Sequence, residues 1–392
     1  MKKERADLSK FRLETRLALA GRDAARFDGA INPPLHRATT LVIADSDDLY
    51  HTSKKTYGLQ GMAIQDALKE ALVTIEGGAG VTLAPSGLAA CTLALMAVAK
   101  AGGELLVTDS VYGPTRKFCD TTLKRFGVRA HYFDPHIGAA VAGLITKDTC
   151  GIFLESPGSI TFEIQDVPAI VAAARAHGVA TMIDNTWSAG VYFQPFAHGV
   201  DLSIQALTKY QSGHADVFMG AVLAATPDWD ARARASYAQL GLNASPDDSY
   251  LVLRGLRTMA VRLERQSASA LRVAQWLATR PEIARVLHPA LPSHPDHALW
   301  SRDFTGASGV FAVILKPCAK ERLKAMLEGL SLFSMGFSWG GYESLALPCD
   351  ANIIRTAAPW SAEGPLVRFS IGLEHPDDLT ADLAAGLGRL AA

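Results

Sequence analysis

The chain has 392 residues, of which 49% are hydrophobic, with a formal net charge of −1 and a mean hydropathy of +0.13. This length exceeds what one ordinary core holds, so we expect two domains, and the near-neutral charge argues against nucleic-acid binding. The longest mostly apolar stretch, Pro85 to Ala99, is too short to span a bilayer, and the charged N-terminus indicates no signal peptide. Five scattered cysteines without a Cys-x-x-Cys pattern predict reduced thiols in a cytoplasmic protein with no membrane partner.

The first two thirds of the chain predict a polar arm followed by alternating strands and helices. Residues 1–60 are polar and show little periodicity, so we expect an extended N-terminal arm. Helical spacing begins at Met62 and continues to Ile75. Beyond it, the sequence predicts strands at 81–84, 104–108, 128–133, 150–154, 179–184, 201–207 and 217–224, and helices at 87–100, 114–126 and 167–177. This alternation predicts a doubly wound, mostly parallel α/β sheet.

The last third predicts a second, smaller unit. One nearly uninterrupted helical pattern runs from Pro246 to Arg280 and is too long for a crossover of the sheet. It is followed by expected strands at 309–315 and 366–371 and expected helices at 320–330 and 377–390. We therefore expect an N-terminal arm over 1–60, a large domain over 61–250 and a smaller α+β C-terminal domain over 251–392.

Two of the expected strands lead into ionisable residues. Asp184 ends the first apolar run and Lys209 follows the second. Because the chemistry of open α/β sheets lies beyond the carboxyl ends of the strands, we expect both side chains in one crevice. Pyridoxal 5'-phosphate (PLP) needs such a pair, an amine to bind its aldehyde carbon and a carboxylate to keep its pyridine nitrogen protonated. A lysine after a buried strand more often faces solvent, so this hypothesis depends on its pairing with Asp184.

Several other residues suit the same site, each with a simpler alternative. Ser86, Gly87 and Leu88 stand where a strand meets a helix and form a candidate phosphate site, or else an ordinary capped helix. Thr208 can donate a hydroxyl to the phosphate, and Tyr112 can stack on a flat ring or simply pack. The segment Ser334 to Glu343 is aromatic and glycine-rich, so it walls a pocket or forms a packed turn.

Arg368 is a charged residue inside an apolar run, Leu366 to Ile371. Burial of a guanidinium costs several kcal/mol unless it has a partner. A substrate carboxylate held by a bidentate contact supplies that partner, and a structural salt bridge is the alternative.

Two further patterns are weaker. The Pro-rich stretch that contains His288, His294 and His297 predicts an extended loop, and we expect no metal site there. The glycines of Glu76 to Gly80 precede a strand, whereas a dinucleotide fingerprint follows one, so a nicotinamide oxidoreductase is disfavoured.

Four motifs together resemble the Cys/Met-metabolism PLP enzymes, also called trans-sulfuration enzymes, from about residue 10 to the C-terminus. They are Leu154-Glu-Ser-Pro-Gly-Ser159, Met182-Ile-Asp-Asn-Thr-Trp187, Ser203-Ile-Gln-Ala-Leu-Thr-Lys-Tyr210 and Phe337-Ser-Trp-Gly-Gly-Tyr-Glu-Ser344. The resemblance implies a fold-type-I, aminotransferase-like architecture and a homotetramer built from two catalytic dimers. It also implies a carbon–sulfur β-lyase of methionine biosynthesis, which converts L-cystathionine to homocysteine, pyruvate and ammonia, with cystine and cysteine as rival substrates.

The family's site residues carry over motif by motif. Lys209 corresponds to the Schiff-base lysine and Asp184 to the partner of the pyridine nitrogen. Tyr112 corresponds to the tyrosine that stacks on the pyridine ring of the cofactor. Tyr57 corresponds to a tyrosine that reaches in from the neighbouring subunit. The implied catalytic residues are Lys209, Tyr57 and Tyr112; the other cofactor-binding residues are Asp184, Ser86, Gly87, Leu88 and Thr208; the substrate-binding residues are Arg368, Ser338, Trp339 and Tyr57.

The chain departs from the family's pattern at two places. The family usually has a phosphate-binding arginine just after the tyrosine, but here the run is Tyr57-Gly-Leu59-Gln60. The loss of one charge-assisted contact of about 1.5–3 kcal/mol weakens cofactor binding about tenfold or more unless another residue compensates. Phe337 stands where relatives often have tyrosine.

Two alternatives stay open for the function. The first is chemistry at Cγ, as in γ-lyases and γ-synthases; Trp339 and Tyr342 favour β-elimination instead, by comparison with those relatives. The second is a PLP-binding regulator without turnover.

Overall fold

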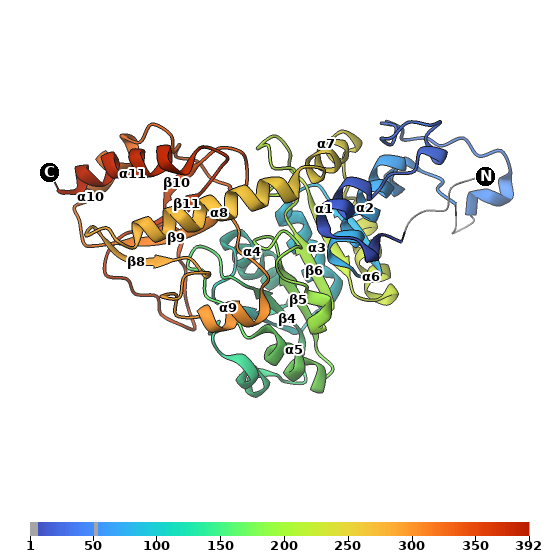
Figure 1. The fold of residues 1–392 in the computed structure, drawn as a ribbon. Coiled ribbons are helices and arrows are strands. Elements are labelled where there is room, and N and C mark those ends of the chain that lie inside the picture. Colours follow the sequence, from blue (N-terminus) through green and yellow to red (C-terminus); the bar gives the residue numbers. More distant parts are fainter. Residues whose placement is uncertain (1–6, 51–53, 392) are drawn as a thin grey trace.

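The computed structural model describes residues 7–50 and 54–391, and a seven-stranded sheet lies at its centre (Figure 1). Strands β2 to β6 pair in parallel, while β7 runs antiparallel to its two neighbours. The spatial order is β1 (Gly80–Ala84), β7 (Gly220–Ala224), β6 (Leu202–Gln205), β5 (Ala180–Asp184), β4 (Thr149–Glu155), β2 (Glu104–Thr108) and β3 (Arg129–Phe133). The prediction of a doubly wound, mostly parallel sheet is confirmed.

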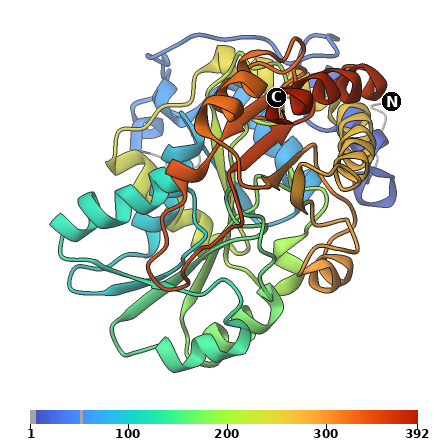
Figure 2. The ribbon, with the colours of Figure 1, turned by 90° about the vertical axis from the view of Figure 1, so that its left-hand side faces the viewer.

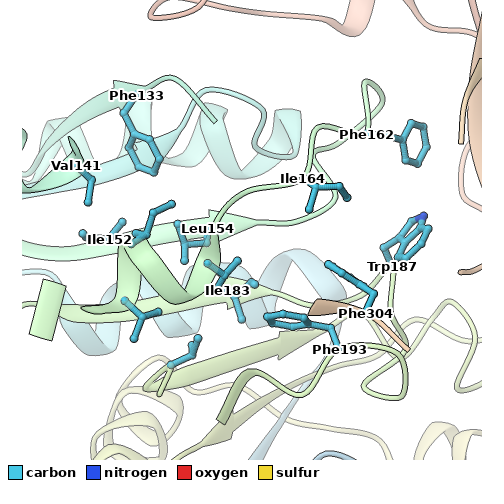
Figure 3. Close-up of a cluster of buried hydrophobic side chains, with 14 of the residues drawn as sticks. Phe133, Val141, Ile152, Leu154, Phe162, Ile164, Ile183, Trp187, Phe193 and Phe304 are labelled. Atoms are coloured by element: carbon cyan, nitrogen blue, oxygen red, sulfur yellow. The ribbon is translucent and has the colours of Figure 1, made fainter. Parts of the chain in front are cut away.

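Both faces of this sheet are buried, which is why its central strands read as continuous apolar runs. On β4, Phe153 packs in the cluster that includes α3 (Gly87–Val98), whereas its neighbours Ile152 and Leu154 pack on the opposite face with α5 (Val167–Ala176). Figure 3 shows Ile152, Leu154 and Ile183 side by side in this second cluster. Helix α6 (Pro227–Gln239) packs beside α3, and α4 (Gly113–Phe118) continues through a π-helical turn over Cys119–Leu123.

The long helix expected from Pro246 to Arg280 is in fact two helices, α7 (Pro246–Leu256) and α8 (Met259–Leu277). At the break, the N–H groups of Arg257 and Thr258 bond to carbonyls only three residues earlier. The guanidinium of Arg257 donates to the carbonyls of Leu17 and Ala20 in the N-terminal segment. This tertiary contact has no signature in the apolar periodicity. Helix α8 then runs from the large sheet to the C-terminal elements (Figure 1).

A second sheet of four antiparallel strands forms the C-terminal part, with its helices on the outside (Figure 2). Its order is β10 (Leu345–Pro348), β11 (Leu366–Ser370), β9 (Val310–Leu315) and β8 (Ile283–Leu287), with helices α10 (Lys320–Glu328) and α11 (Pro376–Ala391). The apolar core continues between the two sheets, because Phe304 packs 5.9 Å from Trp187 and 4.9 Å from Phe193, centroid to centroid (Figure 3). We propose the boundary near residue 250 on the basis of α7 and α8.

Two short helices were not expected. Helix α1 (Leu13–Leu19) lies in the N-terminal segment and buries Leu17 against α2 (Ala63–Glu76). Helix α9 (His297–Asp303) begins within the Pro-rich stretch that we expected to be an extended loop. Among the described residues, no helix combines the length and apolarity that a membrane crossing requires.

The core of the large sheet gives a first test. Ile152 has no exposed surface, so Ile152→Ala is expected to lower the free energy of unfolding by about 2–5 kcal/mol through lost burial and a residual cavity. Leu240→Ala is the matched control, because Leu240 is 47% exposed and should change stability by no more than about 0.5 kcal/mol. Urea unfolding followed by circular dichroism measures both, and equal losses would contradict the packing described.

Candidate active site

A cavity of about 400 Å3 lies beyond the carboxyl ends of β4, β5 and β6. Residues that are far apart in sequence line it. They come from the N-terminus of α3, from the segments that follow β2, β4, β5 and β6, and from the C-terminal part. The predicted site residues among them are Ser86, Gly87, Leu88, Tyr112, Asp184, Thr208, Lys209, Ser338, Trp339 and Arg368.

Asp184 is the last residue of β5 and points into this cavity with defined partners. Its Oδ1 accepts hydrogen bonds from the N–H of Thr186 at 3.1 Å and from the Thr186 hydroxyl at 2.5 Å. The Sγ of Cys91, on α3, lies 3.6 Å from Oδ2. Burial raises the pKa of Asp184, although the bonds from Thr186 oppose that rise. Such a carboxylate is stabilised by any cation that enters the cavity beside it.

Lys209 lies in the loop after β6, and its amine borders the same cavity. Its Nζ donates to the hydroxyl of Ser338 at 2.7 Å and lies 5.2 Å from the ring centroid of Trp339. Burial lowers the pKa of Lys209 to about 8, helped by the positive charge of Arg368 and opposed by Asp184. The amine therefore loses its proton far more easily than a lysine in water, as a base or nucleophile requires.

The C-terminal loop that contains Ser338 and Gly340 lies against Lys209 and has an unusual backbone conformation. Ser338 has a φ of 83°, and Gly340 has the same φ. A Cβ on Gly340 would lie 3.3 Å from the Lys209 Cβ, so this glycine lets the loop run close to the lysine. The strain at Ser338 is of a kind that concentrates at functional sites.

The N-terminus of α3 offers a site for an anion. Ser86 Oγ accepts the N–H of Ala89 at 3.1 Å, and the carbonyl of Ser86 accepts the N–H of Ala90. Within the described part of the chain, the N–H groups of Gly87 and Leu88 keep no such partner, as is usual in a first helical turn. The Thr208 hydroxyl is engaged twice with Met219, since it accepts the N–H of that residue at 3.0 Å and donates to its carbonyl at 3.2 Å.

Arg368 lies on β11 and reaches the cavity from the C-terminal sheet. Its guanidinium donates to the carbonyl of Ser338 at 2.9 Å. No carboxylate among residues 7–50 and 54–391 forms an ion pair with it, so the structural salt bridge weighed above is not found there. Tyr112, 42% exposed, borders the same cavity at the start of α4.

Tyr57 is the one predicted site residue that this cavity does not include. It is 54% exposed and pairs with Thr40 in an isolated bridge of the N-terminal segment. The neighbouring Gln60 accepts the N–H groups of Thr56 and Tyr57 through its side chain. The nearby cations are engaged, Lys54 with Asp48 and Lys55 with Asp66.

Each of the three histidines of the Pro-rich stretch makes a side-chain contact with a backbone group. His288 Nδ1 accepts the N–H of Ala290 at 3.2 Å, and His294 Nδ1 accepts the N–H of Asp296 at 3.1 Å. His297 Nδ1 lies 3.0 Å from the carbonyl of Pro289. These contacts shape the turn before α9.

Sequence reasoning gave no role to Glu155, which also lines the cavity. Glu155 ends β4 next to Asp184 on β5, and its Oε2 accepts the N–H of Tyr112 at 2.6 Å. Burial, and then the neighbouring Asp184, raise the pKa of Glu155. The rule that found Asp184, an ionisable residue at the end of a buried strand, would also have found Glu155. Cys91 carried no such signal, because an apolar helix face is an ordinary place for a cysteine.

The coupling between Arg368 and Lys209 gives a prediction that needs no ligand. Because Arg368 lowers the pKa of Lys209, Arg368→Met should raise it above about 8. The measurement is the pH dependence of the reaction of Lys209 with an amine reagent, resolved by peptide mass spectrometry. Arg285→Met, which removes an exposed guanidinium paired with Glu363, is the control and should leave the midpoint unchanged. A lower or unaltered midpoint in Arg368→Met would contradict the coupling.

Known proteins are similar to this chain in architecture and in sequence. A crystal structure of cystathionine gamma synthase from Xanthomonas oryzae pv. oryzae in complex with cystathionine superposes with a TM-score of 0.90 at 30% identity, over 97% of this chain and 99% of that one. The cystathionine beta-lyase of Salmonella typhimurium strain LT2 is 43% identical, over 96% of this chain and 98% of its own length. The cystathionine beta-lyase MetC of Escherichia coli strain K12 is 42% identical, over 97% and 99%.

A family model described as Cys/Met metabolism PLP-dependent enzyme matches residues 14–388, almost the whole chain. The resemblance inferred from four short motifs is thereby confirmed, and so is the dependence on PLP. On the strength of that match and of the cavity just described, the chain belongs to the Cys/Met metabolism PLP-dependent enzymes.

Proposed function

We propose that this protein is a carbon–sulfur β-lyase that converts L-cystathionine and water to homocysteine, pyruvate and ammonia in methionine biosynthesis. The observation that carries the proposal is that Lys209, Asp184 and Arg368 border one cavity although they come from three separate parts of the chain. An amine, a carboxylate and a guanidinium supply the base, the partner of the ring nitrogen and the partner of an amino-acid carboxylate.

The residues present fit PLP. A Cβ on Gly87 would lie 2.6 Å from the Cβ of Ala206, so the first turn of α3 packs against the loop after β6 only with glycine there. The phosphate is proposed to bind the N–H groups of Gly87 and Leu88, with Ser86 as the helix cap and the Thr208 hydroxyl nearby. Tyr112 would stack on the ring, and Asp184 would hold the proton on the pyridine nitrogen. When bound, PLP supplies an electron sink for negative charge that develops at the substrate Cα.

Lys209 is proposed to move the protons of the reaction. Its lowered pKa makes Nζ a competent base for the Cα proton at neutral pH, and the hydroxyl of Ser338 orients Nζ at 2.7 Å. The same ammonium can then return a proton to the sulfur atom as the Cβ–S bond breaks. The ring of Trp339 lies beside Nζ, 5.2 Å away at its centroid.

The proposed substrate class follows from the guanidinium of Arg368. Arg368 has a carbonyl partner but no carboxylate among the described residues, so the α-carboxylate of an amino acid is its natural ligand. Two relatives at 42–43% identity are named for β-lyase activity on cystathionine, whereas the γ-synthase structure is 30% identical. These identities favour cleavage at Cβ over chemistry at Cγ.

A second subunit is proposed to complete the site. Phe218 and Phe337 line the cavity and are 78% and 77% exposed, which supports a cover that this chain does not itself provide. Tyr57 of a neighbouring copy is proposed to reach this mouth, in a homotetramer made of two such dimers. The five cysteines are free, which supports the cytoplasm as the compartment.

The product assay tests the reaction directly. The purified protein with PLP and L-cystathionine is expected to release pyruvate and homocysteine, identified by mass spectrometry. 2-Oxobutyrate with cysteine would mean chemistry at Cγ, and bound cofactor without products would mean a regulator; either result would refute the proposal. Lys209→Ala should abolish both turnover and the visible absorbance of the bound cofactor, and unchanged turnover would refute the role of Lys209.

The phosphate site has its own test. Gly87→Ala places a Cβ 2.6 Å from Ala206, so the α3 turn must shift, and the dissociation constant for PLP is expected to rise about tenfold or more. Gly388→Ala is the matched control, because a Cβ there meets nothing within 4 Å. Titration of the cofactor-free protein, followed by tryptophan fluorescence, measures both constants. Equal dissociation constants for the two variants would contradict the proposal that the N-terminus of α3 binds the phosphate.

A further inference from the structure

The loop between β10 and β11 reaches from the C-terminal sheet to the large sheet (Figure 2). Its tip docks on Asp109, just after β2, whose side chain has no exposed surface. The Asp109 carboxylate accepts the N–H groups of Thr356 at 2.9 Å, Ala357 at 2.8 Å and Ala358 at 2.9 Å. It also forms a buried ion pair with Arg116 of α4. Burial opposes ionisation of Asp109, but the backbone N–H groups and Arg116 hold its pKa below the usual value.

Arg355, at the same tip, ties down a second segment of the large domain. Its guanidinium donates to the carbonyl of Asp109 at 2.5 Å, to the hydroxyl of Thr161, and to Glu163 Oε1 at 3.1 Å. Both side chains of the Arg355–Glu163 pair are buried, with 6% and 12% of their surfaces exposed. The planar guanidinium presents its donors in a fixed fork, which suits three acceptors in a defined arrangement, whereas the three donors of an ammonium rotate freely.

The two segments held at this tip are walls of the cavity. Tyr112 lies three residues after Asp109, and the N–H of Ser159 donates to the carbonyl of Ser110 at 2.8 Å. Just before Glu163 lie four residues that line the cavity, Gly158, Ser159, Ile160 and Phe162, here called the 158–162 wall. At the base of the loop, Asp350 accepts the N–H of Leu366, two residues before Arg368. One loop therefore connects the strand that carries Arg368 to both walls.

We propose that Asp109 and Arg355 are positioning residues, which dock the C-terminal sheet so that Arg368 faces Tyr112 and the 158–162 wall across the cavity. Neither residue lines the cavity, so both act through the segments they hold. The kinetic part of this inference rests on the proposed β-lyase function. The structural part needs neither cofactor nor substrate.

The competing explanation is a generic ion pair that only adds stability. Arg302 provides the comparison, because it joins α9 to Asp166 at the start of α5 and so also ties the C-terminal part to the large sheet. Arg302 does not line the cavity. Arg302→Met and Arg355→Met therefore each remove one guanidinium that bridges the two parts of the chain. The Arg302–Asp166 side chains are more exposed, at 48% and 30%, and of the two bridges only that of Arg355 reaches the cavity walls.

The first experiment is hydrogen exchange of the cofactor-free protein. In Arg355→Met, the amides of Ser159 and of Thr356 to Ala358 are expected to exchange about tenfold faster, because their bonds depend on the docked tip. Arg302→Met should leave these amides at the wild-type rate. Unchanged exchange in Arg355→Met would overturn the proposal.

The second experiment is steady-state kinetics of the PLP-loaded enzyme. Arg355→Met should raise KM for L-cystathionine about tenfold while kcat changes less than about threefold, since substrate binding suffers more than the proton transfers of Lys209. Arg302→Met should match the wild type.

If Arg355→Met fails to fold, the double variant Arg355→Met/Glu163→Gln, which leaves no unpaired buried charge, takes its place. An unchanged KM would overturn the proposal, and a wild-type enzyme without turnover would refute the β-lyase function alone, leaving the exchange result to decide the docking.

Discussion

The site depends on one electrostatic constraint, the burial of an amine and a carboxylate beside the same cavity. Burial disfavours the charged form of each group, so it lowers the pKa of Lys209 and raises that of Asp184. The attraction between them works in the opposite direction for both. In the function proposed above, PLP would bring a cationic ring nitrogen to Asp184 and an electrophilic carbon to Lys209, and so would relieve both costs at once.

The order of strands in the large sheet is enough to bring the buried amine and the buried carboxylate together. Strands β4, β5 and β6 are parallel neighbours, so their ends deliver Glu155, Asp184 and, after a short loop, Lys209 to one edge. The cation proposed for the substrate carboxylate does not lie on the large sheet. That cation, Arg368, comes from the second sheet, and the strained Ser338 links it to Lys209 by a hydrogen bond to each. In the proposed function, substrate recognition is therefore shared between the two sheets, so activity would depend on their relative position.

The sequence predicted the parts of this arrangement that local patterns encode. Apolar runs that end on Asp184 and before Lys209 gave both the sheet and the central pair, and motif likeness gave the family. Prediction from the sequence failed for features that coincide with contacts between residues far apart in the chain. At the break between α7 and α8, Arg257 bonds to the carbonyls of Leu17 and Ala20, and the docking of Arg355 on Asp109 joins residues 246 positions apart. Glu155 was within reach of the strand-end rule, whereas nothing in the apolar face of α3 marked Cys91 as a neighbour of Asp184.

The central claim is that the amine of Lys209, and no other, receives the cofactor. Borohydride reduction of the PLP-loaded protein, followed by proteolysis and peptide mass spectrometry, locates the lysine to which the cofactor becomes permanently attached. The account predicts a single phosphopyridoxyl group on the peptide that contains Lys209. Attachment to a different lysine, with Lys209 unmodified, would contradict it.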